Sequence, residues 1–172
     1  ILYSFRRCPY AMRARLIILL SHIEVELREV KLSNKPEEMT TISKKGTVPV
    51  LLLPNNKIID ESLDVMNWAL DINDPENIKN TIINHEKDTK LLIEKFDNDF
   101  KYNLDRYKYY TRYRDDHKLK TKEDHRDLAL ETLQIIEDKL NSQNSWIFGN
   151  HPSFLDIAIL PFVRQYRIAD IA

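Results

Sequence analysis

The sequence is poor in the residues that several functional classes require. In 172 residues, glycine occurs only at Gly46 and Gly149, and cysteine only at Cys8. A glycine-rich phosphate loop needs several glycines close together, so we expect neither Walker-type nucleotide hydrolysis nor a Rossmann dinucleotide site. One cysteine cannot form a disulfide within the chain. Nothing therefore indicates a secreted, disulfide-stapled fold, and we expect a cytoplasmic protein.

The sequence also has no excess of charge of one sign and no long apolar run. The chain has 26 basic and 27 acidic residues, a net charge of -1, so no overall field attracts nucleic acid or an anionic membrane. The longest apolar run, residues 16–20, is far shorter than the roughly 20 residues that span a bilayer. Residues 1–5 lack the basic flank of a signal peptide. We therefore expect neither a nucleic acid nor a membrane as partner.

The first 70 residues alternate short apolar runs with helical patterns. Pro9 is typical of a first helical position, and Asn55-Asn56 is typical of a hairpin turn. Residues 24–32 alternate imperfectly, which suits an edge strand. The predicted order is strand (1–5), helix (from Pro9), strand (24–32), short helix (36–43), strand (48–53), strand (57–59) and helix (62–70).

The later part of the chain is predicted to be helical. Residues 71–77 are polar and contain Pro75, so we expect a linker there, between a domain at 1–70 and a helical domain at 78–172. Polar stretches at 115–122 and 141–144 divide the second domain into three helices. The first has an apolar face that repeats every four residues, the second carries an apolar set of its own, and the third begins near Ser153 with capping-box spacing to Asp156. These sets are Leu92, Phe96, Phe100 and Leu104, then Leu133, Ile136 and Leu140.

Cys8 has the most informative surroundings. It follows a predicted strand and precedes Pro9, so we expect it at the cap of the first helix, where unpaired donors and the helix dipole lower a thiol pKa. Arg6 and Arg7 add positive charge. The alternative is a buried structural cysteine, and the local pattern leaves the two nearly even. The third residue after Cys8 is Ala11, so a mixed disulfide at Cys8 cannot be resolved within the chain. This points to a small-molecule thiol as co-substrate.

Four segments, taken in order, resemble the glutathione S-transferase superfamily, specifically bacterial-type members with an active-site cysteine that are omega-like or glutaredoxin-like. The resemblance is strong over residues 1–70 and weak beyond them. It implies a thioredoxin-like α/β domain (βαβαββα) followed by an all-α glutathione-transferase domain. Because such proteins continue for several further helices, we expect this C-terminal domain to be incomplete, and the absence of a starting Met suggests trimming at the front. The four segments are Cys8-Pro9-Tyr10-Ala11 with Arg13 and Arg15, Asn34-Lys35-Pro36-Glu37, Thr47-Val48-Pro49-Val50, and Glu61-Ser62.

The resemblance implies roles around the sulfur of bound glutathione. Cys8 is the implied catalytic residue, and Tyr10, Val48 and Pro49 are implied contacts of glutathione. A cis bond before Pro49 would turn the Val48 backbone toward the ligand, where its N–H and C=O could pair with a cysteinyl backbone. The alternative is a trans proline that merely begins a strand, which general X-Pro statistics favour.

The resemblance also implies contacts for the two ends of glutathione. Glu61 would accept the γ-glutamyl ammonium, Ser62 would bind its carboxylate, and Lys35 would pair with the glycyl carboxylate. The alternatives are a helix cap for Glu61 and Ser62, and a solvated surface lysine for Lys35.

The predicted function is a glutathione transferase with thiol transferase or reductase activity, with glutathione and a mixed disulfide or small electrophile as substrates. Conjugation of glutathione to small electrophiles is one alternative, and a non-catalytic regulator that binds RNA polymerase is another. The resemblance also implies a homodimer. Basic and aromatic residues alternate at 101–114, a pattern that can bind single-stranded nucleic acid, but the balanced charge favours a cleft for an acceptor molecule. No two of the five histidines have a close helical pair spacing, so no metal is expected.

Overall fold

The computed structural model describes residues 1–116, 120–140 and 144–171. Internal contacts divide the chain into two compact units, Ile1–Lys79 and Asn80–Ala172. Parts of the predicted breaks at 115–122 and 141–144 lie outside the described residues.

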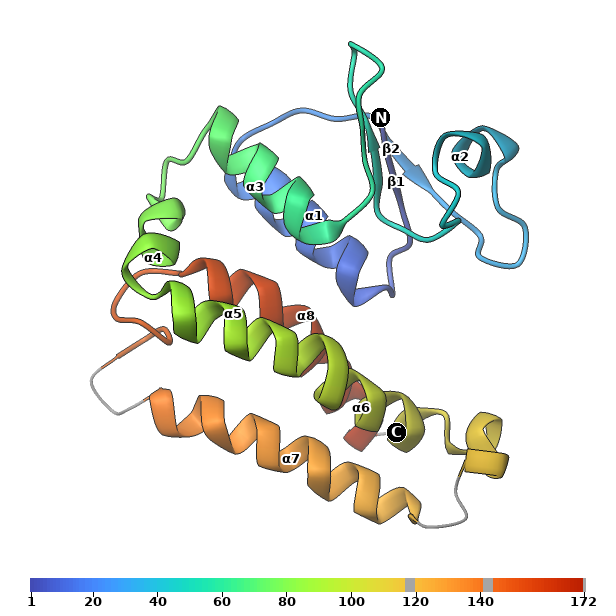
Figure 1. Ribbon diagram of the computed structural model, residues 1–172, viewed down its shortest axis with the longest axis vertical. Helices are drawn as coiled ribbons and strands as arrows, with labels where there is room; N and C mark the ends of the chain where they lie inside the picture. Colours follow the sequence, from blue (N-terminus) through green and yellow to red (C-terminus); the bar gives the residue numbers. More distant parts are fainter. Residues whose placement is uncertain (117–119, 141–143, 172) are drawn as a thin grey trace. The chain divides into compact units, whose positions relative to one another are not determined.

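The first unit contains a four-stranded sheet with the order β2-β1-β3-β4 (Figure 1). The inner strand β1 (Leu2–Ser4) pairs in parallel with β2 (Leu27–Glu29) and antiparallel with β3 (Val50–Leu52), which pairs antiparallel with β4 (Ile58–Ile59). All three residues of β1 are buried. Strand β1 has a neighbouring strand on both sides, whereas β2 lies at an edge of the sheet and pairs on one side only. The four predicted strands are confirmed, and the predicted edge strand is shorter than expected because only its middle pairs with β1.

Three helices cover the sheet, and each was predicted. They are α1 (Pro9–Leu20), α2 (Glu37–Ile42) and α3 (Ser62–Ile72). Figure 1 shows α1 and α3 side by side on one face of the sheet and α2 at the other face. The unit therefore has the predicted βαβαββα order of a thioredoxin-like domain.

The predicted linker is partly helical. Helix α3 ends at Ile72, two residues later than the predicted end. The Asp74 carboxylate accepts hydrogen bonds from the backbone N–H groups of Ile78 and Lys79, both at 2.8 Å, and so begins α4 (Ile78–Asn84). An aspartate that accepts these otherwise unpaired N–H groups is an efficient start signal for a helix.

The second unit is mostly helical in its described residues, as predicted, and residues 144–153 between its last two helices are not helical. Its main helices are α5, α6, α7 and α8, and α6 packs against both α7 and α8. A π-helical turn at Phe96–Phe100 joins α5 to α6, and a 3-10 segment at Tyr110–Asp116 follows α6. The bounds of the four helices are Glu86–Lys95, Lys101–Lys108, Lys122–Lys139 and Phe154–Ile171.

The π-helical turn explains the four-residue apolar repeat. Residues four apart drift around an α-helix of 3.6 residues per turn, so a long repeat of four would wind off one face. A π-helical turn has a wider winding and reverses that drift. It runs from Phe96 to Phe100, whose ring centroids lie 4.7 Å apart. Leu92, Phe96, Phe100 and Leu104 are consequently all buried, as the sequence predicts.

Helix α8 begins with the predicted capping box. Ser153 N donates to Asp156 Oδ2 at 2.9 Å, and Asp156 N donates to Ser153 Oγ at 3.2 Å. Asp156 Oδ1 also accepts a hydrogen bond from Ile147 N at 3.2 Å. All three residues are buried, so one carboxylate satisfies backbone donors from two segments. A second capping box, between Thr121 and Asp124 at the start of α7, was not predicted.

Replacing Asp156 should destabilise the second unit. Asp156→Ala leaves buried N–H groups of Ser153 and Ile147 without their acceptor, which costs about 2–4 kcal/mol. Unfolding can be followed by the fluorescence of Trp146 in a Trp68→Phe background, since these are the two tryptophans of the chain. The exposed Glu137→Ala on α7 is the control and should change stability by less than about 0.5 kcal/mol. Equal effects of the two variants would contradict this account of Asp156.

Candidate functional site

The structure places Cys8 at the predicted helix cap. Cys8 is the N-cap of α1, with extended backbone angles (φ -76°, ψ 123°), and Pro9 is the first helical residue. Cys8 N donates to Phe5 O at 3.0 Å, and Cys8 O accepts from Met12 N at 3.0 Å. The thiol makes no side-chain cap hydrogen bond to the helix, so the sulfur lies at the helix N-terminus without satisfying its donors.

The Cys8 side chain is partly buried. It packs against the core cluster that contains Tyr3, Ala11 and Val48. Its Sγ lies 3.6 Å from the Val48 carbonyl oxygen, toward which the thiol can donate. Cys8 is therefore not fully buried, and its reactivity stays a prediction. The Val48-Pro49 bond is cis, as the resemblance implied, so the trans alternative is wrong.

Lys35 lies against the loop that precedes Val48. Its side chain is exposed, and its Nζ is 3.7 Å from the position that a Cβ would occupy on Gly46. Gly46 has a φ of +59°, a left-handed conformation that favours glycine. Lys35 thus lies beside a backbone segment that leads, two residues later, to Val48.

Glu61 and Ser62 begin α3, but the side chain of Glu61 does not cap it. Glu61 is the N-cap residue and makes no side-chain cap hydrogen bond, while Ser62 is the first helical residue and is 5% exposed. The capping alternative is therefore wrong for the side chain of Glu61. Its carboxylate instead pairs with Lys45 Nζ, and this hydrogen bond raises the pKa of Lys45.

Asp60 extends the ion pair toward the core. Lys45 Nζ also lies 3.6 Å from Asp60 Oδ1, and the Asp60 carboxylate accepts a hydrogen bond from the buried Ser43 at 2.7 Å. The chain's own ammonium group therefore occupies the carboxylate that the resemblance assigns to the γ-glutamyl ammonium. Sequence reasoning missed Lys45, because a lysine in a polar loop carries no distinctive signal.

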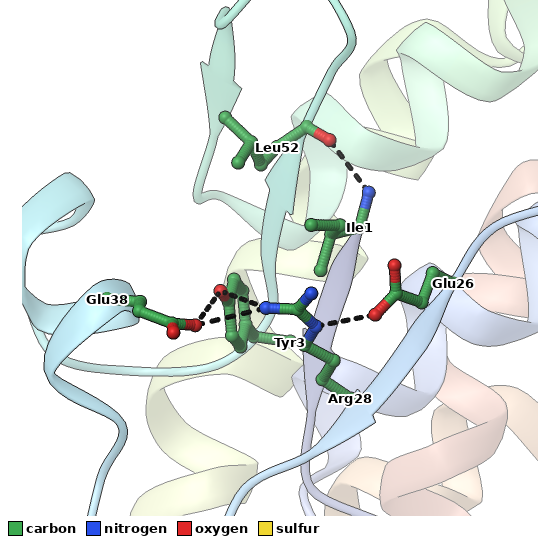
Figure 2. Close-up of polar contacts among 6 residues, drawn as sticks. All are labelled: Ile1, Tyr3, Glu26, Arg28, Glu38 and Leu52. Atoms are coloured by element: carbon green, nitrogen blue, oxygen red, sulfur yellow. Dashed lines mark hydrogen bonds and ion pairs between the residues drawn. The ribbon is translucent and has the colours of Figure 1, made fainter.

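A polar cluster ties α2, the helix that follows Lys35, to the sheet (Figure 2). The buried Tyr3 donates its hydroxyl to Glu38 Oε2 at 3.2 Å and accepts from Arg28 Nη1 at 3.1 Å. Arg28 also donates to Glu38 Oε2 at 3.0 Å and to Glu26 Oε1 at 2.7 Å. The hydrogen bond to Glu26, and after it the one to Tyr3, raise the pKa of Arg28. One tyrosine hydroxyl thus joins β1, β2 and α2.

The predicted residues fall into two groups connected by one loop. Cys8 and Tyr10 lie at the start of α1, with Val48 opposite the sulfur. Lys35 lies near the same loop at Gly46. Glu61 and Ser62 lie at the start of α3, and Lys45 joins Glu61 to that loop. The loop at 45–48 overlaps one of the four segments that carry the resemblance, and it lies beside the other three.

Comparison with known proteins assigns this first unit to a family. Residues 2–77 match the family described as the glutathione S-transferase N-terminal domain. The first unit therefore matches the N-terminal domain of glutathione S-transferases. The chain is 34% identical to glutaredoxin 2 of Escherichia coli (strain K12) over 68 residues, which are 40% of this chain and 31% of that protein. The matched part thus spans about a third of that relative's length.

Two further matches cover nearly the whole chain. Glutathione S-transferase omega-1 of Rattus norvegicus is 27% identical over 98% of this chain and 68% of its own length. The crystal structure of glutathione transferase Omega 3C from Trametes versicolor matches with a TM-score of 0.77 and 21% identity, over 98% of this chain and 74% of that one. The omega-like resemblance and the predicted fold class, a thioredoxin-like unit followed by a helical one, are therefore confirmed.

Neither a metal site nor a membrane-spanning helix is found among the described residues. They contain no group of three or more His, Cys, Asp or Glu side chains placed to hold a metal ion. Within the same residues, no helix has the length and apolar character needed to cross a membrane.

The polar cluster in Figure 2 predicts a specific loss of order in α2. Arg28→Met removes the guanidinium that donates to both Tyr3 and Glu38, so we expect amide hydrogen exchange in α2 to become several-fold faster with little change in global stability. Thr40 and Ser43, whose amides bond to Pro36 and Met39, are the reporters.

The matched control for Arg28→Met is Lys31→Met, which removes the same charge from an exposed residue two positions after β2. It should leave exchange in α2 unchanged. An unchanged exchange rate in Arg28→Met would show that the cluster does not hold the helix.

Proposed function

We propose that this protein is a glutathione-dependent thiol transferase in which the Cys8 thiolate is the nucleophile. The observation that carries the proposal is the position of Cys8, a partly exposed thiol at the N-terminus of α1 and opposite the Val48 carbonyl. Unpaired helix N–H groups stabilise a thiolate at that position, and the thiolate is the reactive form. The similarity to a protein named glutaredoxin and to omega-class transferases supports the same choice.

The proposed reaction has two exchange steps. The Cys8 thiolate attacks the glutathione sulfur of a mixed disulfide, a new disulfide forms between Cys8 and glutathione, and the other thiol leaves as a thiolate with the electron pair of the broken bond. A second glutathione thiolate then attacks the glutathione sulfur bound to Cys8. This step releases glutathione disulfide and restores the Cys8 thiolate. Ala11, at the third position after Cys8, offers no internal thiol, so the second glutathione is required.

The contact between Cys8 and Val48 makes the first step depend on the substrate. A thiol that donates to a carbonyl oxygen is stabilised in its neutral form, which opposes the effect of the helix N-terminus. A cysteinyl N–H of bound glutathione that donates to the same Val48 oxygen would take the place of the thiol. We expect this exchange to release Cys8 and favour its ionisation when substrate binds.

The ends of glutathione are proposed to bind away from the sulfur. Glu61 would accept the γ-glutamyl ammonium in place of Lys45, and Ser62 would bind the neighbouring carboxylate at the start of α3. Lys35 would pair with the glycyl carboxylate, and Tyr10, in the first turn of α1, would line the sulfur site. The acceptor is proposed to be a small electrophile or a mixed disulfide, and the protein a cytoplasmic homodimer.

Two alternatives differ in the fate of Cys8. In a conjugating transferase, Cys8 would only orient the glutathione thiolate toward an electrophile, without forming a disulfide. In a regulator that binds RNA polymerase, glutathione chemistry would be lost. The joint retention of Cys8, Lys35, Glu61 and Ser62 favours the catalytic reading over the regulator.

The reaction of Cys8 with oxidised glutathione distinguishes thiol transfer from conjugation. We expect wild-type protein to gain one glutathione by mass spectrometry, while Cys8→Ser gains none and loses thiol transfer to the uncatalysed level. Cys8→Ser should keep weak conjugation, because a hydroxyl still donates to a glutathione thiolate. Cys8→Ala should fold normally, since Cys8 lies at a cap and is only partly buried. A wild type without the adduct but with strong conjugation of a chlorinated aromatic would reverse the choice.

The Lys45 pair predicts an unusual gain in affinity. Lys45→Met removes the ammonium group that occupies Glu61, so we expect S-methylglutathione, an unreactive probe, to bind about two- to fivefold more tightly. Glu61→Gln should instead weaken binding, because the probe's ammonium loses its charged acceptor.

The neighbouring Lys44→Met is the matched control for Lys45→Met, since it removes the same charge from an exposed lysine of the same loop. Its affinity, measured by the same calorimetric titration, should equal that of the wild type. Weaker binding of the probe by Lys45→Met would show that Lys45 binds glutathione rather than competing with it.

A further inference from the structure

The side chain of Arg15 makes several hydrogen bonds to the segment that precedes Cys8. Its side chain projects from α1 and is partly buried. Nη1 donates to the hydroxyl of the buried Ser4 and to Phe5 O at 3.2 Å, and Nη2 donates to Arg6 O at 3.1 Å. One guanidinium therefore binds three successive residues, from the last residue of β1 into the segment before Cys8, and its planar fork of donors suits such an arrangement.

The Phe5 carbonyl links this guanidinium to Cys8. Phe5 O accepts one hydrogen bond from Arg15 Nη1 at 3.2 Å and another from Cys8 N at 3.0 Å. Residues 5–8 form a tight turn, here named the 5–8 turn, that ends at the helix cap. Fixing the Phe5 carbonyl fixes the acceptor of the Cys8 amide, and so fixes where the Cys8 side chain leaves the backbone.

Glu29 supports the 5–8 turn from the other side. The backbone N–H of Arg6 donates to Glu29 Oε1 at 2.9 Å, so the peptide groups of the turn are bound by a cation from α1 and by an anion from β2. Burial lowers the pKa of Arg15, and attraction to Glu29 and to the Cys8 thiolate acts in the opposite direction. The charged side chains that are bonded to the 5–8 turn or belong to it include Arg15 and Glu29, together with the exposed Arg6 and Arg7.

We propose that Arg15 is the positioning residue of Cys8: it holds the 5–8 turn so that the sulfur stays at the helix N-terminus opposite Val48, and its charge favours the thiolate. This inference rests on the proposed function, because it gives Arg15 a part in the chemistry of Cys8. Sequence spacing carries a signal for it, since Arg15 follows Cys8 by seven residues, or two helical turns, and thus returns to the same side of α1.

The test measures alkylation of Cys8 by iodoacetamide as a function of pH, without glutathione. Cys8 is the one cysteine of the chain, so the signal belongs to a single thiol. In Arg15→Met we expect the apparent pKa of Cys8 to rise and alkylation at pH 7 to slow about three- to tenfold. Lys57→Met is the matched control, because it removes the same charge from an exposed residue of the β3–β4 turn and should match the wild type.

Arg15→Lys separates the charge from the hydrogen bonds and also serves if Arg15→Met does not fold. It keeps a cation but loses the fork, so we expect faster hydrogen exchange of the Cys8 amide and an alkylation profile between those of the wild type and Arg15→Met. Unchanged amide exchange in Arg15→Lys, or an unchanged alkylation profile in folded Arg15→Met, would overturn the proposal. A protein that gives the expected Arg15 results but forms no adduct with glutathione would refute the proposed function alone.

Discussion

Strand β1 is the part of the first unit on which the other elements depend. It is hydrogen-bonded on both edges, to β2 and to β3, and all three of its residues are buried. Its side chains face in two directions. Leu2 and Ser4 alternate with Tyr3, whose hydroxyl reaches α2, while Ser4 meets Arg15 of α1. The strand then passes directly into the 5–8 turn, so the position of the reactive thiol is set by a segment that cannot move without breaking the sheet.

The order of the helices and strands could be predicted because residues with strong local preferences mark where several of them begin or end. Pro9 fixes the start of α1, and the Asn55-Asn56 turn separates β3 from β4. Boundaries were less certain. The strand predicted at 24–32 is ordered as a strand only where β1 pairs with it, and α3 continues to Ile72 because nothing in its last turn stops it. The π-helical turn was hidden as well, since a repeat of four apolar residues is compatible with an ordinary helix.

The candidate site divides in the same way. Residues adjacent to a helix start, such as Cys8, Glu61 and Ser62, were placed correctly because sequence position alone determines that they begin α1 and α3. The groups that occupy or support them were not predicted. Lys45 reaches Glu61 across sixteen residues, and the contact between Cys8 and Val48 spans forty. Such partners depend on how the strands bring distant loops together, and the sequence around a loop lysine does not indicate which distant residue it contacts.

Strand β2 has a consequence for how the protein behaves among other copies of itself. An edge strand offers a row of unpaired backbone groups to which a strand of another molecule can add, and long, flat, apolar edges are the most vulnerable. Here the edge is three residues long, and Arg28 on it is held by Glu26 and by Glu38. A strand that approached would have to fit beside these charged side chains and their water. We therefore expect the cluster that joins α2 to the sheet also to disfavour pairing of another strand with the β2 edge.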